Sequence, residues 1–135
     1  MTQSAASAFP WDSRVPRPAG FNAGAIWTDA HLLAEVKAGV QAVFGSRLDK
    51  ILLYGSRARG DAGPESDYDI AVSLHGIADP LDDAEALADL ATALIYRSGG
   101  KVVSFAVFAP EQLDTPGELT GELTADNIRR EGRLL

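Results

Sequence analysis

One stretch constrains the fold more than any other part of the chain. Residues 51–72 read ILLYGSRARGDAGPESDYDIAV, which is an apolar run, a Gly-Ser pair, a polar loop and a second apolar run that opens with alternating aspartates. Short apolar runs bounded by glycine and polar residues are typical of buried strands. The stretch therefore predicts two strands, with a Gly-Ser turn after the first and two carboxylates at the start of the second.

The Gly-Ser turn has the residue types that phosphate binding needs. Gly55 lets the backbone approach a ligand closely, and backbone N–H groups together with the Ser56 hydroxyl can bind phosphate oxygens. A Gly-Ser pair after a strand is a weak signal by itself, because most such pairs are simply turns.

The two aspartates, Asp67 and Asp69, are separated by one residue at the start of the second predicted strand. Strand alternation places both carboxylates on the same face, about 7 Å apart along the backbone. Two carboxylates that converge repel each other unless a cation lies between them, and Mg²⁺ prefers oxygen ligands and the company of phosphates. An Asp-x-Asp also occurs by chance in surface turns, so the pair alone does not decide between these interpretations.

The rest of the chain alternates between helical and strand patterns. Apolar periodicity predicts a helix from Thr28 to Gly45 and a second helix that begins at Asp79 and Pro80 and ends at residues 98–100. A continuous run of strand-forming residues, 101–108, predicts a third strand, and the tail from 111 to 135 predicts one or two short helices. Residues 1–26 show no period and are predicted to be an irregular arm that packs on its own domain or binds a partner, which leaves one domain over 27–135.

Composition excludes several classes of function. The 135 residues contain no cysteine and only two histidines, so thiolate and histidine-rich metal sites are excluded. The net charge of -7 argues against direct nucleic-acid binding, because that binding neutralises phosphates with basic side chains. No apolar run reaches the roughly 20 residues of a membrane span, and no signal peptide is evident, so the expected location is the cytoplasm.

The Gly-Ser turn and the aspartate pair together are a far more specific signal of function than either is alone. Gly55-Ser56, ten residues, and then Asp67-x-Asp69 between two strands resembles the signature of the DNA polymerase beta-like nucleotidyltransferase superfamily. The strings at 55–60 and 66–70, with the closing residues 128–132, resemble the minimal nucleotidyltransferase (MNT) family. The resemblance covers about residues 30–135.

This resemblance implies a fold and a reaction. The fold would be of the α/β (α+β) class, a small mixed β-sheet with helices packed on one side. Mg²⁺ held by Asp67 and Asp69 would bind a nucleoside triphosphate, with ATP the expected one, and a nucleoside monophosphate would pass to a hydroxyl. Gly55 and Ser56 would hold the β- and γ-phosphates. Arg57 and Arg59 would assist them, or would instead brace the loop against nearby carboxylates (Asp61, Glu65 or Asp67).

The chain departs from the family at one position. Active members carry a third carboxylate on a later strand, and the matching position here is Ser104. Serine is neutral at working pH and is a poor Mg²⁺ ligand and a poor general base. Whether the protein is an enzyme is therefore left open: it would be a nucleotidyltransferase with an incomplete carboxylate triad, and Ser104 could equally be a packed strand residue without a role.

Three functions follow from the resemblance. The first is an MNT-type antitoxin that transfers the nucleotide group to a hydroxyl of a partner protein, usually a small helical HEPN-domain toxin in this family. The second is a catalytically weakened nucleotide- or partner-binding module, favoured by Ser104. The third, an aminoglycoside nucleotidyltransferase-like enzyme, ranks last because the chain lacks room for the extra helical domain. Homodimerisation through an apolar face that the small sheet leaves uncovered is also open.

Overall fold

The computed structural model describes residues 26–114 and 122–135. All but the last residue of the expected N-terminal arm lies outside this range, so the arm and the domain boundary at 27 stay predictions. Packing begins at Trp27, which is 7% exposed and whose backbone N–H donates to the Ser98 carbonyl at 3.0 Å.

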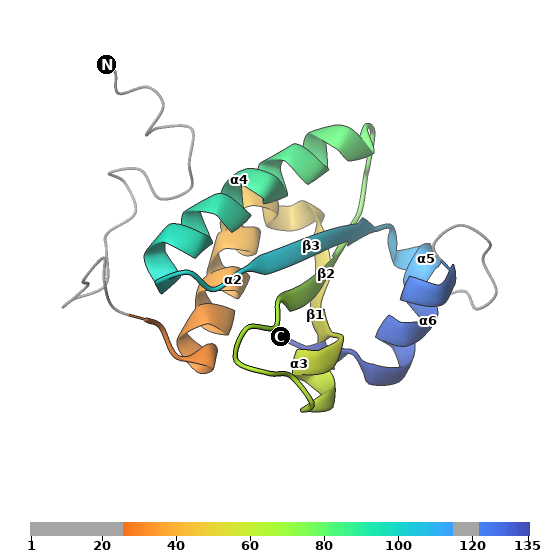
Figure 1. Ribbon diagram of the computed structural model, residues 1–135. Coiled ribbons are helices and arrows are strands. Elements are labelled where there is room, and N and C mark those ends of the chain that lie inside the picture. The colour runs from red at the N-terminus through yellow and green to blue at the C-terminus, as the bar shows by residue number, and fades with distance from the viewer. Residues whose placement is uncertain (1–25, 115–121) are drawn as a thin grey trace, which may run out of the picture.

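The described residues form helices and strands in a mixed order (Figure 1). The helices are α2 (Asp29–Phe44), η1 (Gly45–Arg47), α3 (Ser56–Arg59), α4 (Pro80–Ser98), α5 (Pro110–Asp114) and α6 (Glu122–Glu131). The strands are β1 (Leu48–Tyr54), β2 (Tyr68–Leu74), β3 (Val103–Phe108) and β4 (Arg133–Leu134). Both long helices and the three longer strands were predicted from the sequence; η1 and β4 were not.

The long helices begin and end where their capping residues lie. The Thr28 side chain accepts a hydrogen bond from the His31 N–H, and the Asp79 side chain accepts one from the Leu81 N–H. Such side chains satisfy N–H groups that have no partner within the helix. Helix α4 ends at Gly99, whose φ of 82° is the left-handed conformation that glycine adopts without strain.

The four strands form one sheet in the order β3-β2-β1-β4. Strand β1 pairs antiparallel with both β2 and β4, whereas β2 and β3 are parallel. The parallel pair is joined by α4, which crosses one face of the sheet (Figure 1). The predicted small mixed sheet is therefore confirmed.

The two faces of the sheet carry different cores. Helices α2 and α4 cover one face, where Ile51, Leu53, Ile70, Val72 and Val103 are buried. On the opposite face the short C-terminal helices α5 and α6 pack through Leu113, Ala125 and Ile128 onto Ala71 and Phe108. Helices therefore lie on both faces of the sheet, and the prediction that they pack on one side alone is wrong because α5 and α6 bury a second apolar cluster. This second core covers only part of its face, so the residues at the start of β2 remain accessible there.

Among the described residues, no helix has the length and apolar character needed to cross a membrane.

Candidate active site

Gly55 brings the turn after β1 against a carboxylate. Its φ of 76° and ψ of −158° lie in a region that is essentially restricted to glycine. A Cβ at this position would overlap the Oδ2 atom of Asp69. Both constraints require glycine here, and together they explain how the Gly-Ser turn and the second aspartate come to share one site.

The two predicted carboxylates lie in different environments. Asp67 is exposed, whereas Asp69 is partly buried. Burial raises the pKa of Asp69 above its ordinary value, the negative charge of Asp67 raises it further, and Arg59 opposes both effects. A partly buried carboxylate whose charge is destabilised by a neighbouring carboxylate is an arrangement that a bound cation relieves.

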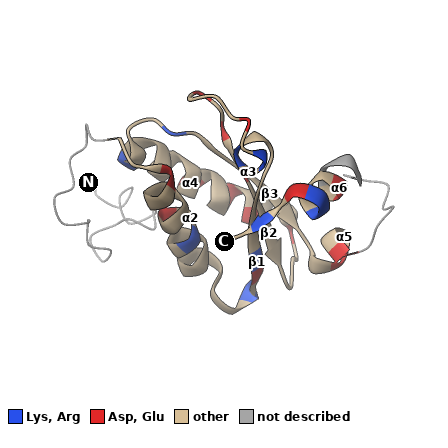
Figure 2. Ribbon diagram, turned by 90° about the horizontal axis from the view of Figure 1, so that it is seen from below, with Lys and Arg blue, Asp and Glu red and all other residues tan. Residues whose placement is uncertain are grey.

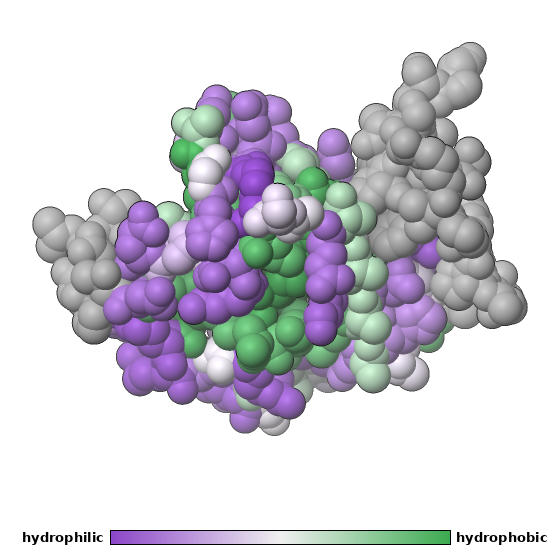
Figure 3. All heavy atoms as spheres, turned by 180° about the vertical axis from the view of Figure 1, so that it is seen from behind, coloured by the Kyte–Doolittle hydropathy of each residue, from purple (hydrophilic) through white to green (hydrophobic). Residues whose placement is uncertain are grey.

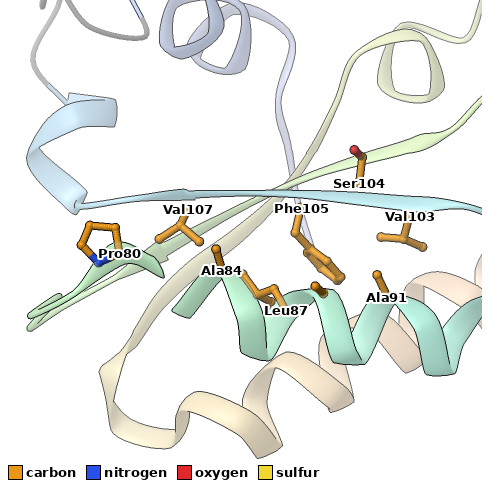
Figure 4. A pocket seen from close by; sticks show the side chains of 9 residues that line it. Pro80, Ala84, Leu87, Ala91, Val103, Ser104, Phe105 and Val107 are labelled. Atoms are coloured by element: carbon orange, nitrogen blue, oxygen red, sulfur yellow. The ribbon is translucent and has the colours of Figure 1, made fainter. Parts of the chain in front are cut away.

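A row of side chains crosses the sheet at Asp69. Tyr54 on β1 and Ser104 on β3 are its direct neighbours in register, so all three side chains lie on the same face. Burial, and then the charge of Asp69, raises the pKa of Tyr54. Ser104 is exposed, and its side chain points away from Val103 and Phe105, which face α4 (Figure 4).

A cavity of about 430 Å³ lies between α4 and β3, but it belongs to the other side of the sheet. Ala84, Leu87 and Phe105 line it with apolar side chains (Figure 4). Ser104 is among the residues at the edge of this cavity, but its side chain points away from α4 (Figure 4), so we place the candidate site on the opposite face, with Asp69.

Arg57 braces the loop that joins α3 to β2. Its guanidinium donates to the Ser66 carbonyl at 2.9 and 3.2 Å and to the Pro64 carbonyl at 3.4 Å, and it lies 4.1 Å from the centre of the Tyr68 ring. For Arg57 the bracing alternative expected carboxylates of the loop, but the loop supplies carbonyl oxygens. For Arg59 that alternative is confirmed, because Arg59 donates to Asp61 at 3.1 Å. A part for Arg57 in phosphate binding stays a prediction.

Arg59 and Glu131 complete the charged surroundings of the turn. Arg59 donates to Asp61 at 3.1 Å and to Glu131 at 2.9 Å. The same Glu131 oxygen accepts a hydrogen bond from the Gly55 backbone N–H at 3.1 Å. Both α3 and α6 carry charged residues, and the loop after α3 carries acidic ones (Figure 2).

Sequence reasoning did not assign a role to Glu131 or Tyr54. Glu131 stands 76 residues after Gly55, and no local pattern indicates that contact. The position of Tyr54 could have been used to place it near the site. It immediately precedes the Gly-Ser turn, on a strand that the sequence pattern predicted.

The donor set fits Mg²⁺. Among the described residues, no group of three His, Cys, Asp or Glu side chains lies close enough to hold a metal. Two carboxylates suffice in principle, since Mg²⁺ is commonly held by one or two carboxylates, substrate phosphates and water. His75 is not a candidate ligand: it pairs with Asp49 at 3.7 Å, beyond the opposite end of β2.

Comparison with known proteins identifies the family. The family model described as "Polymerase beta, Nucleotidyltransferase" matches residues 40–113, more than half of the chain. The chain belongs to this nucleotidyltransferase family, and the predicted polymerase beta-like fold is confirmed. Members of this family are typically metal dependent. No curated protein matches the sequence significantly.

Two solved structures have similar folds. One is a crystal structure of a toxin-antitoxin with AMP-PNP, 20% identical, with a TM-score of 0.52 over 79% of this chain and 72% of that one. The other is a putative nucleotidyltransferase from Sulfolobus solfataricus, 23% identical, with a TM-score of 0.48 over 77% of this chain and 76% of that one. At this identity the first likeness supports the fold.

Proposed function

We propose that this protein binds a magnesium-nucleoside triphosphate, with ATP as the expected nucleotide, at the Gly55-Ser56 turn and the Asp67/Asp69 pair. It transfers the nucleoside monophosphate to a hydroxyl of a partner protein, in the manner of an MNT-type antitoxin. The observation that carries the proposal is the packing of Gly55 against Asp69, which joins the phosphate-binding turn to the carboxylates.

The reaction is a substitution at the α-phosphorus. The acceptor hydroxyl oxygen forms a bond to that phosphorus, the bond to the bridging oxygen breaks, and pyrophosphate leaves. The hydroxyl proton passes to solvent or to a base of the partner, because Ser104 offers none. Bound Mg²⁺ would neutralise the charge that develops on the phosphate oxygens. Asp67 and Asp69 would hold the ion. Gly55, which has no side chain, would leave room for the Asp69 carboxylate.

The acceptor is proposed to be a protein, for two reasons. The described residues form one four-stranded sheet with its helices, and no separate helical domain that could form an acceptor pocket is found among them. The similar toxin-antitoxin structure was solved with AMP-PNP, a nucleotide analogue. We therefore propose a HEPN-type helical protein as the partner.

An apolar surface between α2 and β4 supports the partner part of the proposal. A cavity of about 320 Å³ there is lined in part by Leu33, Leu53 and Leu134, and Leu134 is 70% exposed. Apolar side chains gather at the centre of the face seen from behind, with polar side chains around them (Figure 3). Exposed apolar patches with polar rims commonly mark protein interfaces, including homodimer interfaces.

The test compares binding and transfer in matched variants. Asp67→Asn with Asp69→Asn should abolish magnesium-dependent binding of ATP, measured by isothermal titration, and transfer of a labelled nucleotide to the partner. The control, Glu85→Gln with Asp89→Asn, removes the same charge from exposed positions on α4 and should leave both unchanged. Full magnesium-ATP affinity in the folded Asp67/Asp69 variant would refute the proposed site.

A second function, nucleotide binding without transfer, is favoured by Ser104. Ser104 lies beside Asp69, at the position where active relatives are expected to have a carboxylate. Magnesium-dependent binding of ATP, with no labelled product on any partner offered, would select this alternative.

A further inference from the structure

The carboxylate of Glu131 occupies a backbone N–H of the turn that the proposed function assigns to phosphate, together with Arg59, which the family resemblance also places near the phosphates. One oxygen of Glu131 accepts from the Gly55 N–H at 3.1 Å and from Arg59 Nη1 at 2.9 Å. The Glu131 side chain is 18% exposed and that of Arg59 is 46% exposed, so the carboxylate is largely shielded from water while the guanidinium remains accessible. A backbone N–H combined with a guanidinium is the donor set that recognises phosphate oxygens.

We propose that Glu131 is an internal anion that competes with the nucleotide phosphates for Gly55 and Arg59. This inference rests on the proposed function and adds a regulatory residue to it. The Gly55 N–H already donates to Glu131, and a well-aligned hydrogen bond favours a single acceptor, so a phosphate oxygen gains the full bond only after Glu131 has left it. The measured affinity for nucleotide is then lower than the intrinsic one, because the binding-competent state is only part of the population.

Rotation of the Glu131 side chain is enough to release the contact. Helix α6 stays in place through Ala125 and Ile128, which are buried in the second core. Its end is fixed by the Gly132 N–H, which donates to the Ile128 carbonyl at 2.7 Å, and by β4, which pairs with β1. Arg59 keeps Asp61 as a partner at 3.1 Å after Glu131 leaves.

A role for Glu131 as the missing third metal ligand is not supported. No three acidic, histidine or cysteine side chains in the described part of the chain form a metal-binding group. The one Glu131 oxygen that reaches the turn is already bound to two donors, one of them cationic. The geometry is that of an anion held by donors, which is the state that phosphate would replace.

The experiment titrates the full chain with magnesium-AMP-PNP and, separately, with magnesium pyrophosphate. Glu131→Gln is isosteric and removes the charge, and Glu131→Ala removes the acceptor as well. Because hydrogen bonds to charged groups are the stronger ones, both variants should bind each probe about tenfold more tightly than the wild type. Glu85→Gln on the exposed face of α4 is the charge control and should bind as the wild type does.

The outcomes separate this inference from the proposed function. If the wild type binds both probes and neither Glu131 variant binds more tightly, Glu131 supports the turn rather than competing, and the inference is overturned while the proposed function stands. If only the Glu131 variants bind, the competition is confirmed in its strongest form. If no variant binds either probe, both proposals fail. Should Glu131→Ala unfold, as seen by circular dichroism, the isosteric Glu131→Gln decides alone.

Discussion

Strand β2 has two faces with opposite properties, although their residues alternate along one short segment. Ile70 and Val72 are fully buried beneath the two long helices. Asp69, one residue before Ile70, points to the other face, where burial and a second carboxylate raise its pKa. A one-residue step thus separates the part of the strand that stabilises the fold from the part that can do chemistry. This separation can be tested by substitutions that change either the stability or the nucleotide affinity and leave the other unchanged.

The largest change in the free energy of unfolding is expected from a substitution on the helix-covered face. Ile70→Ala removes a fully buried side chain and should lower the free energy of unfolding by about 2–5 kcal/mol, because it loses apolar burial and leaves a cavity. Urea denaturation measures the change. At temperatures where the variant is folded, its affinity for magnesium-ATP should equal that of the wild type. A loss below 1 kcal/mol, or an altered affinity in the folded protein, would show that the two faces are not separate.

Gly55→Ala should disturb both properties. The backbone conformation is costly for alanine, by about 1–3 kcal/mol, and the added Cβ would displace the Asp69 carboxylate. We expect a measurable fall in the midpoint of thermal unfolding and loss of magnesium-nucleotide binding. Gly45→Ala is the matched control, since Gly45 also has a positive φ, of 55°, but no atom lies near its missing Cβ. That variant should lose stability while keeping its affinity for nucleotide.

A smaller effect is expected at Asp83, at the start of α4, and it should depend on pH. Two hydrogen bonds from Arg47, at 2.8 and 3.0 Å, lower the pKa of Asp83. A lowered pKa adds stability that is fully present above the ordinary aspartate pKa and is lost as the pH falls through the folded value. Wild type and Asp83→Asn should therefore differ in unfolding free energy at neutral pH and converge in acid, without a change in nucleotide affinity.

Urea denaturation between pH 7 and pH 2 checks this, with Asp82→Asn as the control. Asp82 is the exposed neighbour on the same turn of α4 and forms no ion pair among the described residues. A difference between wild type and Asp83→Asn that stays constant across the range would contradict the assignment to Arg47.

The parts of the structure that could be predicted from the sequence are those encoded locally. Strand periodicity predicted β2 with Asp69 near its start, and the caps at Thr28 and Asp79 marked the helix starts that are observed. The contact between Glu131 and Gly55 depends on how α6 packs, over a separation of 76 residues, so no local pattern contains it. Strand β4 was missed for a related reason, since two residues show no periodicity and pair only because β1 is there.

The smallest effect on stability, and the sharpest test of the chemistry, is expected at Ser104. The residue is exposed and lies next to Asp69 in the parallel register, with its side chain on the same face. A substitution there should change the free energy of unfolding by no more than about 0.5 kcal/mol, as at most surface positions. Ser104→Asp would nevertheless add a carboxylate beside the pair that is proposed to hold Mg²⁺.

The argument for a gain in function rests on charge. A magnesium-bound triphosphate is held more tightly by three carboxylates than by two, because a neutral hydroxyl contributes little to the metal. Ser104→Asp should therefore bind Mg²⁺ more tightly and raise transfer from a low wild-type baseline, measured with labelled ATP and the partner. Ser46→Asp adds the same charge at an exposed position in η1 and should change neither quantity. Rapid transfer by the isolated wild type, with no gain in Ser104→Asp, would mean that the site acts without a third carboxylate.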